Sequence, residues 1–304
     1  MALQNPAQRA ALERAQAAYL HACELDVAVR KPGNVSRFSA GHGMQAALFS
    51  ASARASVAPL FLRGARVGDR IEAAVDATAA VAGCNTNLGI VLLCAPVARA
   101  IDLHPQASAP AALHAAIVAV LADLDVSDAR AAYRAIARAH PGGLGTAEAE
   151  DVHDLPSVDL RAAMALAADR DSIARQYRDG YAELLALDLS ALAEDSGFRP
   201  ADADAPLPAS AAAAVHRVYL GFLAGGPDSH IVRKHGAAPA QTVMRSAQPW
   251  LARAAAGEPL DGDPAFAAWD LALKAAGLNP GTSADLTVAA LFVAGLIAPA
   301  ARLP

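Results

Sequence analysis

Four short segments hold most of the lysines and asparagines of this chain, and both residue types are otherwise rare in it. The segments are ELDVAVRKPGNVSRFSAGHG (24–43), GCNTNLG (83–89), GGPDSHIVRKHG (225–236) and LNPGTSADL (278–286). Each one joins a loop of small residues to the start of a predicted helix, where backbone N–H groups and the helix dipole favour an anion. Together the segments predict a binding site for a phosphate-rich ligand.

The side chains of these segments supply the donors that such a ligand needs. Cations form strong, charge-assisted hydrogen bonds with phosphate, while amides, hydroxyls and glycines allow close approach of N–H groups. Asparagine and serine also serve as turn residues and helix caps, and that alternative stays open for each one alone. The two histidines among the candidates are also candidates for proton relay. The predicted nucleotide and phosphate ligands are Lys31, Gly33, Asn34, Ser36, Arg37, His42, Asn85, Thr86, Asn87, Gly89, His230, Arg233, Lys234, Gly281 and Ser283.

Five carboxylates are predicted for acid–base chemistry, and four of them also for binding Mg²⁺. Glu72 and Asp76 are spaced i, i+4, so both emerge on one helical face and would suit a shared divalent cation. Glu24 and Asp285 complete the predicted metal ligands, and Asp228 is the fifth candidate for catalysis. The alternative for Glu24, Glu72 and Asp76 is an exposed or salt-bridged position on a helix. The alternative for Asp285 is a purely structural role at the start of a helix.

Helices are the elements that must position these segments. Alanine dominates the chain, alternating β-branched runs are scarce, and apolar residues recur at helical spacing. We predict an all-α protein: one domain over residues 1–304, with about ten to twelve helices and a buried core rich in Ala, Leu and Val. The Pro- and Asp-rich stretch 196–208 is predicted to be an exposed loop. The predicted helices span 7–29, 45–63, 69–82, 86–101, 109–122, 127–139, 159–187, 209–224, 239–256, 263–276 and 283–298.

Composition narrows the function. The 304 residues are 55% hydrophobic and 18% charged, with a net charge of −5, which gives no electrostatic footprint for nucleic acid or for an anionic membrane. The N-terminus lacks the pattern of a secretory signal, and the uncharged runs are shorter than the roughly 18 residues of a membrane span. The three cysteines have no CxxC spacing. We expect a cytoplasmic protein that acts on small-molecule nucleotides, and an Ala-rich helical surface would suit a homodimer.

The order of four motifs, KPGNVSR, NTNLG, D-x-H-x-x-RKHG and NPGTSADL, resembles the triphosphoribosyl-dephospho-CoA synthase family over about residues 20–300. The resemblance implies an all-helical transferase that takes ATP and 3′-dephospho-CoA and releases adenine. It also implies that the product is the 2′-triphosphoribosyl precursor of a prosthetic group of acyl carrier proteins. ATP is then a substrate, accompanied by Mg²⁺.

The implied reaction breaks the N-glycosidic bond at C1′ of ATP through a transition state with oxocarbenium character. It needs a base for the acceptor hydroxyl, a proton for the departing adenine and neutralisation of the triphosphate. We predict that the carboxylates meet the first two needs. The cations Lys31, Arg37, Arg233 and Lys234 are predicted to meet the third.

Two departures from the family pattern leave the acceptor open. Lyase-associated members read like NTHKG where this chain has Asn87 and Leu88, and they place an acidic residue after the position of His42, where this chain has none. The chain therefore resembles a divergent branch, associated with tetrahydromethanopterin-type one-carbon metabolism. Two alternatives follow: an Mg-ATP-dependent ligase or kinase-like enzyme of pterin or one-carbon cofactor synthesis, and a non-catalytic nucleotide-binding helical protein.

Overall fold

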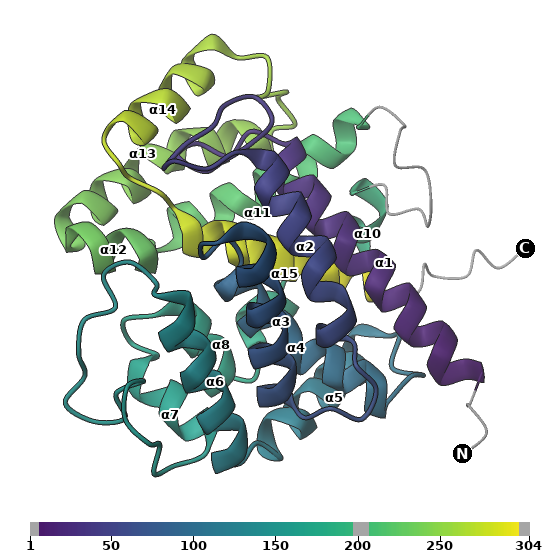
Figure 1. Cartoon of the computed structure of the whole chain (residues 1–304). Coiled ribbons are helices and arrows are strands. Elements are labelled where there is room, and N and C mark those ends of the chain that lie inside the picture. The colour runs from purple at the N-terminus through teal and green to yellow at the C-terminus, as the bar shows by residue number, and fades with distance from the viewer. Residues whose placement is uncertain (1–5, 197–206, 298–304) are drawn as a thin grey trace, which may run out of the picture.

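Helices account for the regular structure of residues 6–196 and 207–297, the residues that the computed structural model describes (Figure 1). The all-α prediction is confirmed in these ranges, which contain fifteen helices and no strand. In chain order the helices are α1 (Pro6–Ala28), α2 (Ala46–Leu60), α3 (Val67–Ala82), α4 (Leu88–Leu103), α5 (Pro110–Ala122), α6 (Val126–Ala139), α7 (Leu160–Ala167), α8 (Ser172–Arg178), α9 (Ala182–Leu185), α10 (Leu189–Asp195), α11 (Ala209–Gly225), α12 (Ser229–His235), α13 (Ala237–Ala255), α14 (Pro264–Ala275) and α15 (Gly281–Leu296).

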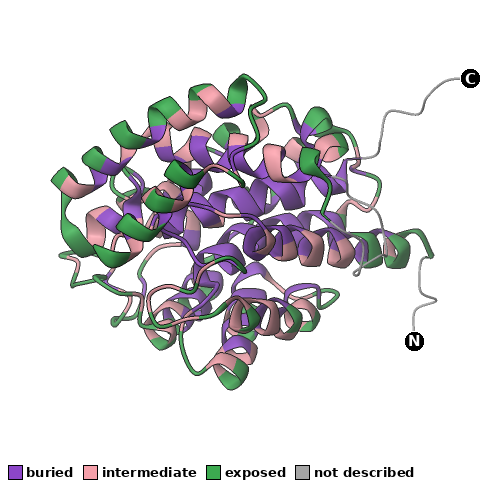
Figure 2. Ribbon diagram, turned by 90° about the horizontal axis from the view of Figure 1, so that it is seen from above, coloured by how far each residue is buried: buried purple, intermediate pink, exposed green. Residues whose placement is uncertain are grey.

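The centre of the fold is formed by α4 and α15, which are apolar on nearly every side. Helices of that composition are buried all round, and both lie within a shell of helices whose outer faces are exposed (Figure 2). α15 packs against α1, α4 and α11. Tyr19, Phe61 and Phe292 meet edge to face, with ring centroids 5.8, 5.9 and 6.0 Å apart. The predicted core rich in Ala, Leu and Val is confirmed for the described residues.

The prediction of a single helix over 159–187 is wrong, because this stretch forms α7, α8 and α9 with turns between them. Asp171 begins α8 by accepting hydrogen bonds from the N–H groups of Ile173 and Ala174, at 2.9 and 3.1 Å. Gly180 follows α8 with φ +66°, a left-handed conformation that favours glycine. The other predicted helices begin and end within a few residues of observed ones. α10 and α12 are additional, so the described residues contain fifteen helices where about ten to twelve were predicted. The loop predicted over 196–208 falls, at 197–206, outside the described residues.

Pro96 interrupts the hydrogen bonds of α4, and α8 compensates for it. Proline has no N–H group, so the carbonyl of Leu92 loses its helical partner. The Tyr177 hydroxyl donates to that carbonyl at 2.6 Å. At the other end of α8, Ile173 Cδ1 would lie 2.8 Å from a Cβ placed on Gly89. The two helices therefore run in the same direction, and their first turns lie side by side.

In the described ranges, no helix taken singly is long and apolar enough to cross a membrane. The pair α5 and α6 passes a test of length and composition only jointly, and these two helices are bent by 93° at the break between them.

Candidate active site

A cavity of about 790 Å³ opens where the first turns of α4 and α15 meet. This volume lies within the range of small-molecule sites, roughly 300–1,000 Å³. The cavity is also lined by the loop 141–152 and by parts of α7, α8 and α12. All four sequence segments contribute to it, although they are far apart in the chain. The predicted site residues that line it are Asn34, Asn85, Thr86, Asn87, Gly89, His230, Arg233, Gly281 and Asp285.

Asp285 is the cavity carboxyl in closest contact with α4. A Cβ placed on Gly89 would lie 2.0 Å from Asp285 Oδ2, so the carboxyl rests directly on the backbone of this glycine. Within the described part of the chain, the Asp285 side chain makes no hydrogen bond and no ion pair. Burial, together with the charges of Asp26 and Asp228, raises the pKa of Asp285 well above its ordinary value. Asp285 therefore keeps its proton to a higher pH than an exposed aspartate does.

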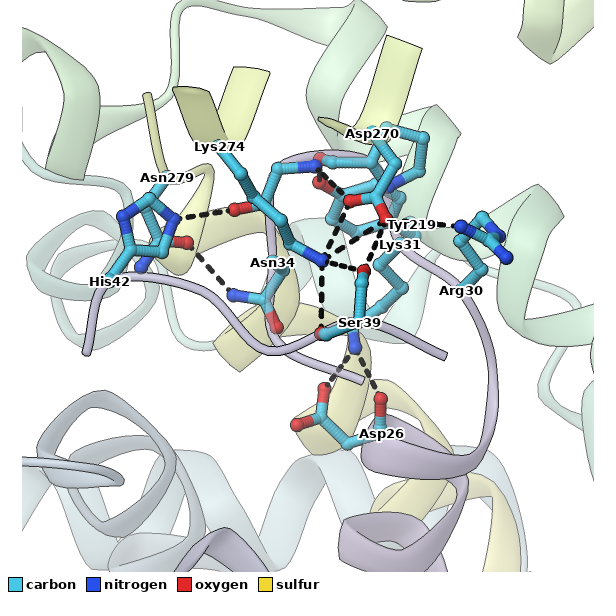
Figure 3. Close-up of polar contacts among 12 residues, drawn as sticks. Asp26, Arg30, Lys31, Asn34, Ser39, His42, Tyr219, Asp270, Lys274 and Asn279 are labelled. Atoms are coloured by element: carbon cyan, nitrogen blue, oxygen red, sulfur yellow. Dashed lines mark hydrogen bonds and ion pairs between the residues drawn. The ribbon is translucent and has the colours of Figure 1, made fainter. Parts of the chain in front are cut away.

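Asp26 is a second cavity carboxyl, and its spacing alone did not mark it as a site residue. It is 4% exposed and lies 3.0 Å, at Oδ1, from Nζ of the fully buried Lys31, which also donates to the Asp26 carbonyl (Figure 3). Burial raises the pKa of Asp26, and Lys31 opposes that rise. The available signal was a carboxylate within the apolar stripe of α1, after Ala22 and Cys23.

Lys31 thus has a different role from the one predicted. Its ammonium is paired with the Asp26 carboxylate, and the side chain does not line the cavity. Lys31 neutralises and orients a cavity carboxylate instead of meeting phosphate directly.

Exchanging Lys31 for methionine should lower the free energy of unfolding by about 3 kcal/mol, because a buried carboxylate would lose its counter-ion. The loss should grow as pH rises, since the unpaired Asp26 is tolerated better when protonated. Urea denaturation at several pH values measures this. The matched change Arg37→Met removes an exposed ion pair from the same KPGNVSR motif and should cost no more than about 1 kcal/mol. Equal losses in the two variants would contradict the pairing of Lys31 with Asp26.

Glu24 and Arg37 lie on the surface, away from the cavity lining. Arg37 Nη2 is 2.8 Å from Glu24 Oε2, and Arg54 Nη1 is 3.8 Å from Glu24 Oε1. Both predicted roles, metal ligand and phosphate ligand, are therefore replaced by an exposed ion-pair network.

Glu72 and Asp76 do share one face of α3, as their spacing predicts, but that face is turned to α6. Arg134 donates two hydrogen bonds of 2.6 Å to Glu72, and Arg138 pairs with Asp76. Each carboxylate already has a counter-ion, and neither lines the cavity. The prediction that they share a cation is corrected: they tie α3 to α6.

The loop that follows α1 is clamped to α14 (Figure 3). Asp270, which is fully buried, accepts hydrogen bonds from the N–H of Gly33 at 2.9 Å and from the hydroxyl of Ser39 at 2.7 Å, and Lys274 Nζ lies 2.9 Å from it. His42 Nε2 donates to the Gly33 carbonyl at 2.8 Å. These contacts shape the loop.

Among the predicted residues of this loop, only Asn34 reaches the cavity. Its Nδ2 donates to Asn279 Oδ1 at 2.9 Å, and Asn279 lines the cavity as well. Gly33, Ser36 and His42 do not line it, so we remove them from the candidate ligands.

Asp228 fixes the start of α15 and has little capacity left for catalysis. Its Oδ2 accepts from both N–H and Oγ of Ser283, each at 2.8 Å. Its Oδ1 accepts from the N–H groups of His230 and Ile231 at 3.0 and 3.2 Å. These hydrogen bonds occupy the usual acceptor capacity of a carboxylate, and neither Asp228 nor Ser283 lines the cavity. Both are structural residues that position α15.

His230 lines the cavity as a neutral group. Burial and the nearby charges of Arg233 and Lys234 lower the pKa of His230 to about 3. Its Nε2 is buried without a hydrogen-bond partner. A Cβ on Gly281 would lie 2.5 Å from His230 Nδ1, so glycine is needed at that position. At neutral pH the imidazole offers a hydrogen bond to an uncharged part of a ligand and does not add positive charge.

Some polar groups of the NTNLG segment form hydrogen bonds within the protein, and others remain available to a ligand. Asn85 Oδ1 accepts from the N–H of Leu88 at 3.1 Å, and Thr86 donates to Ser52 Oγ at 2.7 Å. Asn87 is 5% exposed, and its Nδ2 is buried without a partner. The Asn87 amide and the first N–H groups of α4, which a helix cannot satisfy internally, are the donors that remain for a ligand.

The cations of the third segment lie at the edge of the cavity. Arg233 Nη1 is 3.3 Å from Asp171 Oδ2, and its Nε donates to the Gly142 carbonyl at 3.1 Å. Lys234 is exposed and close to Gly142, but it is not part of the lining. Arg233 thus ties the loop 141–152 to α8.

The spacing of residues in the sequence does not identify several of the residues that line the cavity. Arg170 and Asp171 fall inside the long helix that the pattern predicts, and PGGLG at 141–145 predicts only a turn. The close approach of this loop to α12 is real: Gly143 has φ +74°, and a Cβ there would lie 2.6 Å from the Arg233 carbonyl. The glycines of this loop are the feature of the sequence that could have indicated this close approach.

A preformed metal site is absent from the described residues: no three His, Cys, Asp or Glu side chains are arranged to hold an ion. Of the predicted metal ligands, only Asp285 reaches the cavity. Mg²⁺ bound by nucleotide phosphates needs at most one or two protein carboxylates. Asp285 is therefore the one member of that predicted set placed to contact a phosphate-bound Mg²⁺ ion in the cavity.

The fold is that of a helical protein whose cavity brings helix N-termini, two arginines and six carboxyl side chains into one site. The family model for ATP:dephospho-CoA triphosphoribosyl transferase matches residues 12–302. The chain belongs to this family and is a transferase.

The fold is also similar to a solved structure. A crystal structure from Archaeoglobus fulgidus, provisionally described as a triphosphoribosyl-dephospho-CoA synthase, matches with a TM-score of 0.56 and 20% sequence identity. The match covers 80% of this chain and 96% of that chain, and at this identity it shows the fold alone. No functionally curated protein is similar enough in sequence to count as a match.

Proposed function

We propose that this chain transfers the triphosphoribosyl group of Mg-ATP to a hydroxyl of 3′-dephospho-CoA, or of a related acceptor, and releases adenine. Family membership supports the reaction class. The observation that carries the assignment to this cavity is Asp285, a carboxyl without a hydrogen-bond partner among the described residues and with a raised pKa, placed between the first turns of α4 and α15.

Two bonds change in this reaction. The bond from C1′ to the adenine nitrogen breaks, and a bond from C1′ to the acceptor oxygen forms. One proton must reach adenine, and one must leave the acceptor hydroxyl. Asp285, whose pKa is raised the more strongly, donates a proton to adenine, and Asp26, whose rise in pKa is opposed by Lys31, accepts a proton from the hydroxyl. Environments that separate the pKa values of two carboxyls in this way are typical of acid and base pairs.

The phosphates find their donors at the other groups of the cavity. The first N–H groups of α4 and α15, the Asn87 amide and Arg233 all border the same space. Mg²⁺ enters with ATP and neutralises part of the phosphate charge. Fixed donors of this kind stabilise charge without having to reorganise during the reaction.

The identity of the acceptor is a finer part of the proposal. Leu88 is buried and lines the cavity, so its apolar side chain forms part of the wall itself. An apolar face of α7, made by Leu160, Ala163 and Met164, lines the cavity as well. An acceptor with an uncharged arm, as in dephospho-CoA, suits these surfaces.

The direct test incubates the protein with Mg-ATP and dephospho-CoA and measures free adenine together with the mass of the product. We expect adenine and one triphosphoribosyl adduct in equal amounts. Formation of ADP or AMP in place of adenine would favour a kinase-like or ligase reaction. Binding of ATP without turnover for any acceptor hydroxyl tested would favour a non-catalytic protein.

A further inference from the structure

Two arginines line the cavity, and only one of them has a partner in the described residues. Arg233 is held by Asp171 and by the Gly142 carbonyl. The side chain of Arg170 is exposed and makes no hydrogen bond or ion pair with described residues. Its neighbour Asp169 is paired with Arg178 instead, at 2.8 Å. Arg170 thus brings an unneutralised positive charge to the cavity.

The position of Arg170 follows from the packing of α8 on α4. Arg170 precedes Asp171, the residue that begins α8, and the first turn of α8 lies beside Gly89 through Ile173. Because α8 and α4 run in the same direction, Arg170 emerges at the end of α4 that carries the free N–H groups. The unpartnered Asn87 amide borders the same cavity.

The cations of the cavity lining indicate where phosphates bind. Asp171, which follows Arg170 and also lines the cavity, is paired with Arg233, so the charge of Arg170 remains available to a ligand. Phosphates are therefore expected beside Arg170, at the first turns of α4 and α8. An arginine there can form two parallel hydrogen bonds with phosphate oxygens.

We propose that Arg170 binds the terminal phosphates of the substrate's polyphosphate, together with the first turn of α4 and Asn87. The proposal rests on the proposed function for the orientation of ATP, but not for the test. Arg170 then has a binding role, and the effect of replacing it on nucleotide affinity should increase with the number of phosphates in the nucleotide.

The test compares Arg170→Gln with the unaltered protein by calorimetric titration with Mg-ATP, Mg-ADP and AMP. Arg170→Gln should weaken ATP binding roughly 10- to 100-fold, the range for a lost charged hydrogen bond, and leave AMP binding nearly unchanged. Arg170→Lys should restore part of the ATP affinity. Arg130→Gln is the matched control, because Arg130 is exposed on α6 and does not line the cavity.

Two results would overturn the proposal: unchanged ATP affinity in Arg170→Gln, or an equal loss for ATP, ADP and AMP. No acceptor and no turnover are needed for these titrations. If the unaltered protein releases no adenine while Arg170→Gln still loses ATP affinity selectively, the proposed function fails and the role of Arg170 stands. In an active protein, the same variant should raise KM for ATP and leave KM for the acceptor unchanged.

Discussion

Replacing Asp285 with asparagine should reduce adenine release from Mg-ATP by roughly 10²- to 10⁴-fold, the usual contribution of a general acid. Asparagine has nearly the same shape, so the contact with Gly89 is kept while the proton is lost. ATP affinity should change little. The measurement is kcat by adenine release, with affinity from titration. The unaltered enzyme should also lose activity as pH rises through the pKa of Asp285, and the variant should lack that decline.

Stability provides the control for this variant. The pKa of Asp285 is raised in the folded state above the value of about 3.9 expected for an unfolded chain. The folded protein therefore binds this proton more tightly, and its stability falls as pH rises from the unfolded value through the folded one. Asp285→Asn should remove that part of the pH dependence and be at least as stable as the original at pH 8.

Asp76→Asn is a matched comparison, because Asp76 is exposed and paired with Arg138 outside the cavity. It should leave adenine release unchanged and alter stability by no more than about 1 kcal/mol. Full activity in Asp285→Asn would show that the proton for adenine comes from another group.

The fold was predictable where one physical signal dominated. α4 and α15 are apolar on all sides, and only a buried helix suits such composition. The prediction failed over 159–187 because alanine favours helix throughout that stretch. Asp171 and the left-handed Gly180 end that pattern locally, and two such turn signals outweigh many weak preferences.

The sequence predicted that these loops lie together at one site, but it did not predict which charged residues pair with one another. A lone lysine beside Pro and Gly has the same spacing whether it binds phosphate or a buried aspartate five residues earlier, as Lys31 does. The partners of Glu72 and Asp76 are Arg134 and Arg138, which share the i, i+4 spacing but lie on another helix. Such pairing requires the packing of α3 on α6 to be known.

Arg170 could not be recognised as a site residue from the rarity of its residue type. Arginine supplies nearly every positive charge in this chain, so one arginine more carries no information in the sequence. What distinguishes Arg170 is the missing counter-ion among the described residues, and this is a property of the folded protein alone.

Replacing Gly89 with alanine should reduce activity nearly as much as loss of Asp285, without adding or removing a charge. The new methyl group would lie 2.0 Å from Asp285 Oδ2 and 2.8 Å from Ile173 Cδ1. Since α4 is buried on all sides, the carboxyl is the group that must move. A displacement of about 1 Å in a catalytic group costs roughly a hundredfold in rate. Adenine release at saturating Mg-ATP measures this.

The stability of this variant reports two opposing effects. Overpacking a core costs about 1–3 kcal/mol, whereas alanine within a helix is favoured over glycine by about 0.8–1 kcal/mol. Gly221→Ala on α11 isolates the second effect, because nothing lies within 4 Å of a Cβ at that position. We expect Gly221→Ala to gain stability and keep full activity, and Gly89→Ala to lose both. If Gly89→Ala remained fully active, the Asp285 carboxyl would have to be mobile in the cavity, and its contact with α4 would not be what positions it for catalysis.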